Sequence, residues 1–342
     1  MSSATEISLT AYSAIAAGLI GSAVDSIRPG AAGGNNRVFR VEAEGRVYAL
    51  KQYPVQDRDT RDRLTQEYEA LRFLRERGID NVPTPRAREL VSRCALYDWI
   101  DGRPIDGADD SVLQAMAQLT ERLIDFGSDP EACSLVAASA GCFSGADVTG
   151  QIEHRLSRLR QTAAGDETLA GFLDVTLEPA IQRFAGRARA HYADAGLAFD
   201  RPLPQSERIL SPSDFGFHNG LRTADGRIHF LDFEYFGWDD PIKLVSDARW
   251  HAGMGLDDSQ GDSLQGRIRA EMTAAQRTSF DARFGALHPL FGLMWCLIVL
   301  NEFLPERWTR RNFSGPVGDR AEVLARQLNR ARDYCTRVES LA

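Results

Sequence analysis

The chain has 342 residues, of which 43% are apolar and 26% are charged, so it can bury a large core in one bilobal domain or in two domains. Its net charge of −8 and its pI near 5.4 argue against a nucleic-acid partner, because such a partner requires a basic face. The longest apolar run, residues 290–300, is too short to cross a bilayer, so we expect a buried helix there and no membrane partner.

An apolar patch near the N-terminus, AYSAIAAGLIGSAV, follows Glu6 and has no Lys or Arg before it, unlike a secretory leader. The five cysteines are odd in number, widely spaced and free of CxxC or CxxH patterns. This spacing argues against both a disulfide framework and a zinc site. We therefore expect a cytoplasmic protein with reduced cysteines.

A run of small residues comes next, in which Gly33, Gly34, Asn35 and Asn36 stand directly before an expected strand. Small residues allow backbone N–H groups to approach a phosphate closely. The run is a candidate phosphate-binding turn, although an ordinary turn has the same composition.

Two strands and a helix are expected after this run. Residues 37–41 and 46–53, RVFRV and RVYALKQY, alternate as strands do, and the connection between them ends in Gly45, which predicts a hairpin. Residues 61–78 then carry apolar side chains at helical spacing up to Gly78. The pattern predicts one amphipathic helix beside a small antiparallel sheet.

Lysine is rare in this chain. Of the 40 Lys and Arg residues, only Lys51 and Lys243 are lysines, and a compact ammonium binds differently from a planar guanidinium. Lys51 lies in the second expected strand and Glu67 in the following helix, so the helix could bring the carboxylate to the ammonium. A half-buried lysine needs such a partner, a phosphate or water, because an unpaired buried charge is costly. A solvated lysine at a sheet edge is the alternative.

Residues 94–102, CALYDWIDG, begin as a buried strand and break at an Asp-Gly pair. We place the lobe boundary there. Residues 1–96 then form an N-lobe, residues 97–102 a hinge, and residues 103–342 a helical C-lobe.

The remainder of the chain is mainly helical in pattern. Apolar residues at helical spacing predict helices around residues 112–123, 152–159, 169–192, 280–303 and 321–338. Residues 253–266 are rich in Gly, Asp and Ser, which predicts a mobile acidic loop.

An Asp, an Asn and a second Asp surround the one hairpin expected in this part. Residues 221–223 and 228–233 alternate on either side of an Ala-Asp-Gly turn signal. A hairpin brings its ends together, so Asn219 at its entry and Asp232 at its exit should be neighbours, with Asp214 in the loop before them. Such oxygen ligands suit a hard cation such as magnesium (Mg2+). Turn or helix capping is the simpler explanation for these residue types.

The strand lysine, the helix glutamate, the D-x-x-x-x-N loop and the hairpin Asp-Phe match, in this order, the general arrangement of kinases. The stretches GGNNRVFRV, ALKQY, EYEALRFL, VPTPR, YDWIDGRPI and FLDFEYFGWDDP resemble the aminoglycoside phosphotransferase and choline kinase family. The resemblance covers residues 24–247. It implies an α+β, bilobal protein kinase-like fold with a small antiparallel-sheet N-lobe and a larger, mainly helical C-lobe.

For the nucleotide, the resemblance implies that Lys51 holds the α and β phosphates of ATP and that Glu67 steadies Lys51. It also implies that Tyr97, Asp98 and Trp99 offer backbone groups to adenine. The Gly-Asn run would cover the phosphates.

For the chemistry, the resemblance implies that Asn219 and Asp232 ligate magnesium in the C-lobe hairpin. Asp214, in the catalytic loop, would accept the proton of the attacking hydroxyl group or orient that group.

Two departures from the family pattern stand out. Pro212 and Ser213 occupy the place of the usual His-Gly pair, and the proline ring could make the loop rigid in place of the histidine. Lys243 stands where the family often has an aspartate, and Asp247 could balance its charge one helical turn later.

These features favour an ATP- and magnesium-dependent phosphotransferase that acts on a hydroxyl group of a small metabolite, such as a sugar, an amino sugar or an amino alcohol. The alternative is a kinase-like scaffold that binds a nucleotide or metabolite with little activity. A kinase acting on proteins is disfavoured because no activation segment ending in APE follows the hairpin. A quaternary ammonium acceptor could be boxed by tryptophans, although tryptophans at helical positions more often belong to the core: Trp238, Trp250, Trp295 and Trp308.

Overall fold

The computed structural model describes residues 8–30, 36–53, 62–163, 165–307 and 319–341. Contacts divide the chain into two compact units. The first unit combines Met1–Ile105 with Asn219–Tyr235, and the second combines Asp106–His218 with Phe236–Ala342.

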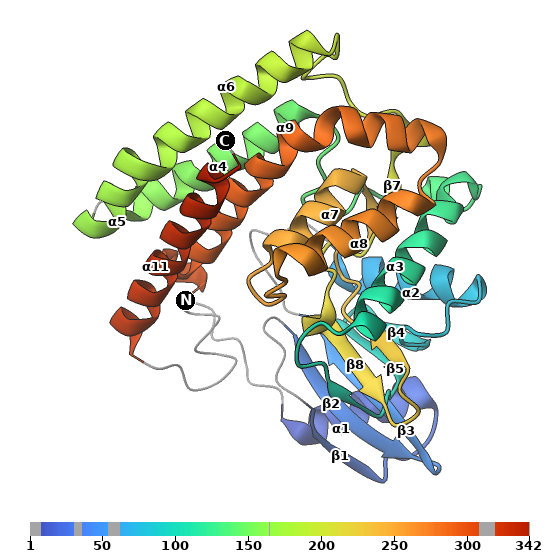
Figure 1. The fold of residues 1–342 in the computed structure, drawn as a ribbon. Coiled ribbons are helices and arrows are strands. Elements are labelled where there is room, and N and C mark those ends of the chain that lie inside the picture. Colours follow the sequence, from blue (N-terminus) through green and yellow to red (C-terminus); the bar gives the residue numbers. More distant parts are fainter. Residues whose placement is uncertain (1–7, 31–35, 54–61, 164, 308–318, 342) are drawn as a thin grey trace. The chain divides into compact units, whose positions relative to one another are not determined.

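The first unit contains a five-stranded antiparallel sheet of order β1-β2-β3-β5-β4. Its strands are β1 (Ser26–Pro29), β2 (Arg37–Ala43), β3 (Arg46–Gln52), β4 (Pro85–Glu89) and β5 (Cys94–Asp98). The described part of this unit also has the helices α1 (Leu9–Ile20) and α2 (Arg63–Glu76). Figure 1 shows the long strands β2 and β3 side by side with α1 near them.

Side chains on one face of this sheet form a core with α1. Tyr48 and Leu50 of β3 lie on the same side of the strand and pack in one core with Tyr12 of α1. Because side chains alternate along a strand, Lys51 lies on the opposite face. The apolar patch near the N-terminus is thus part of a helix that covers the sheet.

The expected hairpin also belongs to the first unit. It consists of β8 (Gly220–Thr223) and β9 (Ile228–Phe230), and β8 pairs with β6 (Gly102–Pro104). The hairpin is expected in the C-lobe from the sequence, whereas its pairing with β6 groups it with the first unit. The lobe boundary at residues 97–102 stays a prediction.

The second unit is mainly helical. Its long helices are α3 (Asp110–Asp125), α4 (Gly145–Ala163), α6 (Glu178–Asp194), α7 (Pro241–Trp250), α8 (Asp258–Glu271), α9 (Ala274–Val299) and α11 (Arg320–Glu339). The short helix α5 (Glu167–Phe172) joins α6 through a π-helical turn. Two short strands, β7 (Ile209–Ser211) and β10 (Gly237–Asp239), pair with each other. In Figure 1, α9 in orange runs alongside α4 in green and α11 in red.

The fold class expected from the sequence is confirmed, since an antiparallel sheet is followed by a mainly helical part. The prediction of a mobile acidic loop at residues 253–266 is wrong from Asp258 onward, because α8 begins there. Asp257 caps this helix, and Leu264 and Ile268 are buried, so capping and burial outweigh the Gly-rich composition.

One helical segment among the described residues, Ala274–Phe303, is long and apolar enough to cross a membrane. Its most apolar window is 72% buried inside the protein, as in the core helix of a globular protein. The interpretation of the tryptophans as core residues holds for Trp238 and Trp250, which are 4% and 2% exposed. Trp308 lies outside the described residues.

Candidate active site

Lys51 is the centre of a charged cluster in the first unit. Its Nζ atom lies 2.6 Å from Oε2 of Glu67 and 2.6 Å from Oδ1 of Asp232. Lys51 and Glu67 are both buried, whereas the side chain of Asp232 is 29% exposed. The cluster therefore joins the sheet, α2 and the end of the hairpin.

The local sequence explains how α2 brings Glu67 to this place. Asp62 caps the helix by accepting a hydrogen bond from the N–H of Thr65, which sets the start of α2. Glu67 lies on the buried side of the helix together with Leu64 and Leu71. A carboxylate on that side needs a cation, and Lys51 supplies it.

The charges of the cluster perturb each other strongly. Burial by itself lowers the pKa of Lys51, but the carboxylates of Asp232 and Glu67 raise it well above its usual range. Burial raises the pKa of Glu67, and the Lys51 ammonium offsets only part of this effect. The ammonium is therefore held as a cation in a site with excess negative charge.

Two tyrosines extend the cluster. The hydroxyl of Tyr53 donates to Oε2 of Glu67 at 2.6 Å and lies 2.7 Å from the hydroxyl of Tyr97. Tyr53 was not predicted as a site residue, although it follows Lys51 by two residues, directly after the end of β3, and such spacing along a strand favours the same face.

The hairpin brings Asn219 close to the chain before Asp232. The N–H of Leu231 donates to the carbonyl of Asn219 at 2.8 Å, and the N–H of Phe233 donates to Oε1 of Glu67 at 3.3 Å. Asp232 itself has a φ of 65°, a conformation that non-glycine residues seldom adopt. Strain of this kind is frequent at functional sites, and the neighbouring hydrogen bonds hold it here.

Glu234 is a further acidic member of the cluster, and no role was predicted for it from the sequence. It is fully buried and accepts hydrogen bonds from Nδ2 of Asn36 at 2.8 Å and from Nη1 of Arg63 at 2.7 Å. Oxygen atoms of Glu67, Asp232 and Glu234 all lie within 4.8 Å of one another.

This oxygen-rich set fits a hard cation. Carboxylate and amide oxygens are the ligands that magnesium prefers. The buried Oδ1 atom of Asn36 has no hydrogen-bond partner among the described residues, so it is a further oxygen available to a ligand. Gly33, Gly34 and Asn35, the rest of the expected phosphate-binding turn, lie outside the described residues.

The segment expected to hold adenine is partly committed to the sheet. The N–H groups of Asp98 and Trp99 donate to the carbonyls of Thr84 and Val47 at 2.9 and 3.2 Å. Tyr97 belongs to β5 and pairs with Ala49. Adenine binding by this segment stays a prediction and must use other backbone groups than these two N–H groups.

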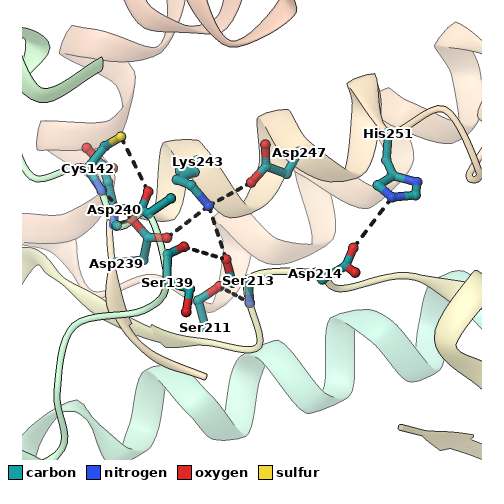
Figure 2. A network of polar contacts seen from close by, with 12 residues as sticks. Ser139, Cys142, Ser211, Ser213, Asp214, Asp239, Asp240, Lys243, Asp247 and His251 are labelled. Carbon is teal, nitrogen blue, oxygen red and sulfur yellow. Dashed lines mark hydrogen bonds and ion pairs between the residues drawn. The ribbon is translucent and has the colours of Figure 1, made fainter. Parts of the chain in front are cut away.

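Asp214 lies in the second unit, in the loop after β7, and contacts two histidines. Nε2 of His218 is 3.1 Å from its Oδ1 atom, and Nε2 of His251, drawn in Figure 2, is 3.5 Å from the same atom. The two imidazole rings stack with centroids 4.0 Å apart. Neither histidine was predicted from the sequence, although His218 follows Asp214 by only four residues.

One hydrogen bond determines which ring nitrogen of His251 carries the proton. Its Nδ1 atom accepts the backbone N–H of Gly253 at 2.9 Å, so the proton of the neutral ring is on Nε2 and points toward Asp214. A protonated Nε2 is not a metal ligand, so we interpret the three side chains as a supported carboxylate and not as a metal centre. Burial raises the pKa of Asp214, but the two imidazoles lower it by more, and the result is well below the usual range.

Asp214 and Asn219 belong to different units. The expected convergence of Asp214 with Asn219 and Asp232 therefore stays a prediction.

The sheet with its paired lysine and glutamate, followed by a mainly helical part, defines a kinase-like fold. A family model described as phosphotransferase enzyme family matches residues 26–275. The chain belongs to this family. The resemblance expected from the sequence is thereby confirmed.

Solved structures show the same fold at low sequence identity. The choline kinase of Streptococcus pneumoniae is 13% identical, with a TM-score of 0.58, 96% of this chain covered and 98% of that chain covered. A gentamicin–APH(2″)-IIa complex is 14% identical, with a TM-score of 0.61 and 96% of each chain covered. A spectinomycin phosphotransferase in complex with ADP and spectinomycin is 13% identical, with a TM-score of 0.57 and coverages of 93% and 94%. A search among curated proteins gave no match.

Proposed function

We propose that this protein uses ATP and magnesium to phosphorylate a hydroxyl group of a small metabolite. The observation that carries the proposal is the Lys51 ammonium, 2.6 Å from both Glu67 and Asp232. A lysine in this position can exchange one carboxylate for a phosphate oxygen while the other carboxylate keeps it in place. Asp232 would then be released toward a cation.

Asn219 and Asp232 would hold magnesium, with Glu234 close to Asp232 as a further source of negative charge. When bound, the metal would offset the negative charge of the phosphates. When no metal is bound, hydrogen bonds from Arg63 and Asn36 keep Glu234 in place.

Asp214 would bind and orient the acceptor hydroxyl. Its depressed pKa keeps it ionised, so it can accept a hydrogen bond from an alcohol at neutral pH. A carboxylate of low basicity mainly positions the hydroxyl group. It takes the proton late, as the O–P bond to the acceptor forms and the bond between the γ-phosphorus and the ADP oxygen breaks, so that ADP leaves.

The acceptor class is proposed from the relatives. Choline kinase, ethanolamine kinase and spectinomycin phosphotransferase are named for small molecules. We propose a sugar, an amino sugar or an amino alcohol as the acceptor of this protein, and a cytoplasmic location.

The test is ADP release from Mg–ATP across a library of sugars, aminoglycosides and amino alcohols, with Asp214→Asn as the control. Acceptor-dependent release that is lost in the control supports the proposal. Binding of ATP and magnesium without release for any acceptor would instead favour the kinase-like scaffold.

A further inference from the structure

A strained turn stands directly before Asp214. Ser213 has a φ of 67°, in the left-handed region that favours glycine, and the N–H of Asp214 donates to the carbonyl of Pro212 at 2.9 Å. This closes a three-residue turn with Ser213 at its centre. Such a turn persists only where its surroundings hold it, and here it sets the direction in which Asp214 leaves the loop.

Three contacts hold Ser213 (Figure 2). Its N–H donates to Oγ of Ser211 at 3.0 Å, and its own Oγ donates to the carbonyl of Ser139 at 3.2 Å. Nζ of Lys243 donates to the same Oγ atom at 3.3 Å. Two of the three contacts therefore act on the hydroxyl group, and one comes from a cation.

Lys243 is itself fixed by two carboxylates. Its Nζ atom lies 2.8 Å from Oδ2 of Asp247 and 3.2 Å from Oδ2 of Asp239, and its side chain is only 6% exposed. Burial lowers the pKa of Lys243, but the two carboxylates raise it well above its usual range. The ammonium therefore stays charged, donates hydrogen bonds to Asp247 and Ser213, and forms an ion pair with Asp239.

A second residue on the same face of α7, His251, contacts Asp214 directly. Lys243, Asp247 and His251 follow each other at intervals of four residues, which places them in one row along the helix and its C-cap. Nε1 of Trp295 donates to Oδ1 of Asp247 at 2.8 Å, and the Trp295 ring packs edge to face on His251 at 4.6 Å. His251 in turn points toward Asp214.

We propose that Lys243 is a positioning residue for Asp214, which it orients through the hydroxyl of Ser213. The proposal rests on the proposed function, since Asp214 is the group that would meet the acceptor. Lys243 makes no contact with substrate in this role. Its effect is to hold the turn, while His251, at the other end of the row, supports the carboxylate.

The kinetic test uses Lys243→Met, Ser213→Ala and the double variant. We expect Lys243→Met to lower kcat by about 10- to 100-fold, because small misplacements of a reacting group have effects of this size. The KM for ATP should stay within about twofold, since Lys243 does not hold the nucleotide. Because Lys243 acts through Ser213, adding Ser213→Ala to Lys243→Met should reduce kcat little further.

The matched control is Arg283→Met. Arg283 is a buried cation of the same unit that pairs with Asp240, outside the 211–214 loop. The Arg283→Met variant should be destabilised as Lys243→Met is, but its kcat per folded molecule should stay at the wild-type value. Equal losses of kcat in the two variants, or a full additive effect of Ser213→Ala, would overturn the proposal.

A second measurement does not depend on activity. Hydrogen exchange of a peptide covering residues 211–216 should accelerate by about tenfold or more in folded Lys243→Met, because the N–H groups of Ser213 and Asp214 are both bonded within the turn. Arg283→Met should leave this peptide unchanged. Unchanged exchange in Lys243→Met would overturn the positioning role, whereas a wild type without phosphoryl transfer would overturn only the proposed function.

Discussion

Lysine occurs only at positions 51 and 243, and both side chains are buried and paired with two carboxylates each. Arginine supplies all other side-chain cations apart from histidine. A compact ammonium can turn three donors toward partners on different elements, whereas a guanidinium has a fixed planar fork. The two lysines of the chain are therefore the centres of two buried charge clusters.

The first prediction at the residue scale concerns the role of Asp214. Asp214→Asn keeps the shape of the side chain but removes the charge and the proton acceptor. Loss of the group that positions the attacking hydroxyl and takes its proton should cost at least ~10²-fold in kcat, while the Kd for ATP changes little. Single-turnover kinetics and calorimetry measure the two quantities. A variant with wild-type kcat would remove Asp214 from the chemistry.

The second prediction at this scale concerns Asp232. In Asp232→Asn, the stabilisation of the protein by ATP should no longer depend on magnesium, because the proposed pair of ligands loses its only full negative charge. Thermal-shift curves with and without magnesium measure this dependence.

Asp225→Asn is the control for that experiment, since Asp225 lies at the exposed turn of the same hairpin and bonds to Thr223 and Arg227. It should behave as the wild type does. The same magnesium response in Asp232→Asn as in this control would count against the assignment.

At the scale of elements, α8 shows how a local signal can outweigh composition. The side chain of Asp257 accepts the N–H of Gln260 at 2.8 Å, and the side chain of Gln260 returns a bond to the N–H of Asp257 at 3.1 Å. This reciprocal pair is a capping box. Asp257→Ala should therefore cost about 1 kcal/mol of unfolding free energy.

Denaturant titration measures that cost, with Asp258→Ala as the control at the next position, inside the helix. The unfolding free energy of the control should fall by less, because Asp258 adds only a favourable charge near the N-terminus of the helix. Equal losses would mean that the cap does not determine where α8 begins.

At the scale of the whole molecule, His288 should make stability depend on pH. Burial lowers its pKa to about 3, with smaller contributions from Arg249 and Arg337. The folded protein therefore keeps His288 neutral while the unfolded chain takes up a proton below its ordinary pKa of about 6.5. Stability is then lost as the pH falls through the window from about 6.5 toward 3.

Between pH 7.5 and 5, this one histidine should contribute a loss of about 2 kcal/mol. The prediction is tested by comparing the unfolding free energy at the two pH values in the wild type and in His288→Gln, which lacks the titrating ring. His154→Gln, at an exposed position, is the control and should keep the wild-type difference. An unchanged pH difference in His288→Gln would show that the buried ring does not control acid stability.

Elements that depend on local periodicity are readable from the amino-acid sequence. Alternation placed Lys51 on a strand, helical spacing placed Glu67 on α2, and the turn signal placed Asn219 and Asp232 at the ends of one hairpin. These features are predictable because side-chain direction follows from φ and ψ over a few residues. The family resemblance relied on the same short stretches.

Contacts between groups far apart in the sequence depend on the three-dimensional packing. It placed Glu234 between Asn36 and Arg63, His251 beside Asp214, and Lys243 against Ser213. No local pattern encodes these pairs, because each depends on how separate elements pack and on which buried charge needs a partner. Burial of a charge is costly unless a partner is present, so packing selects partners across the chain that spacing along it does not reveal.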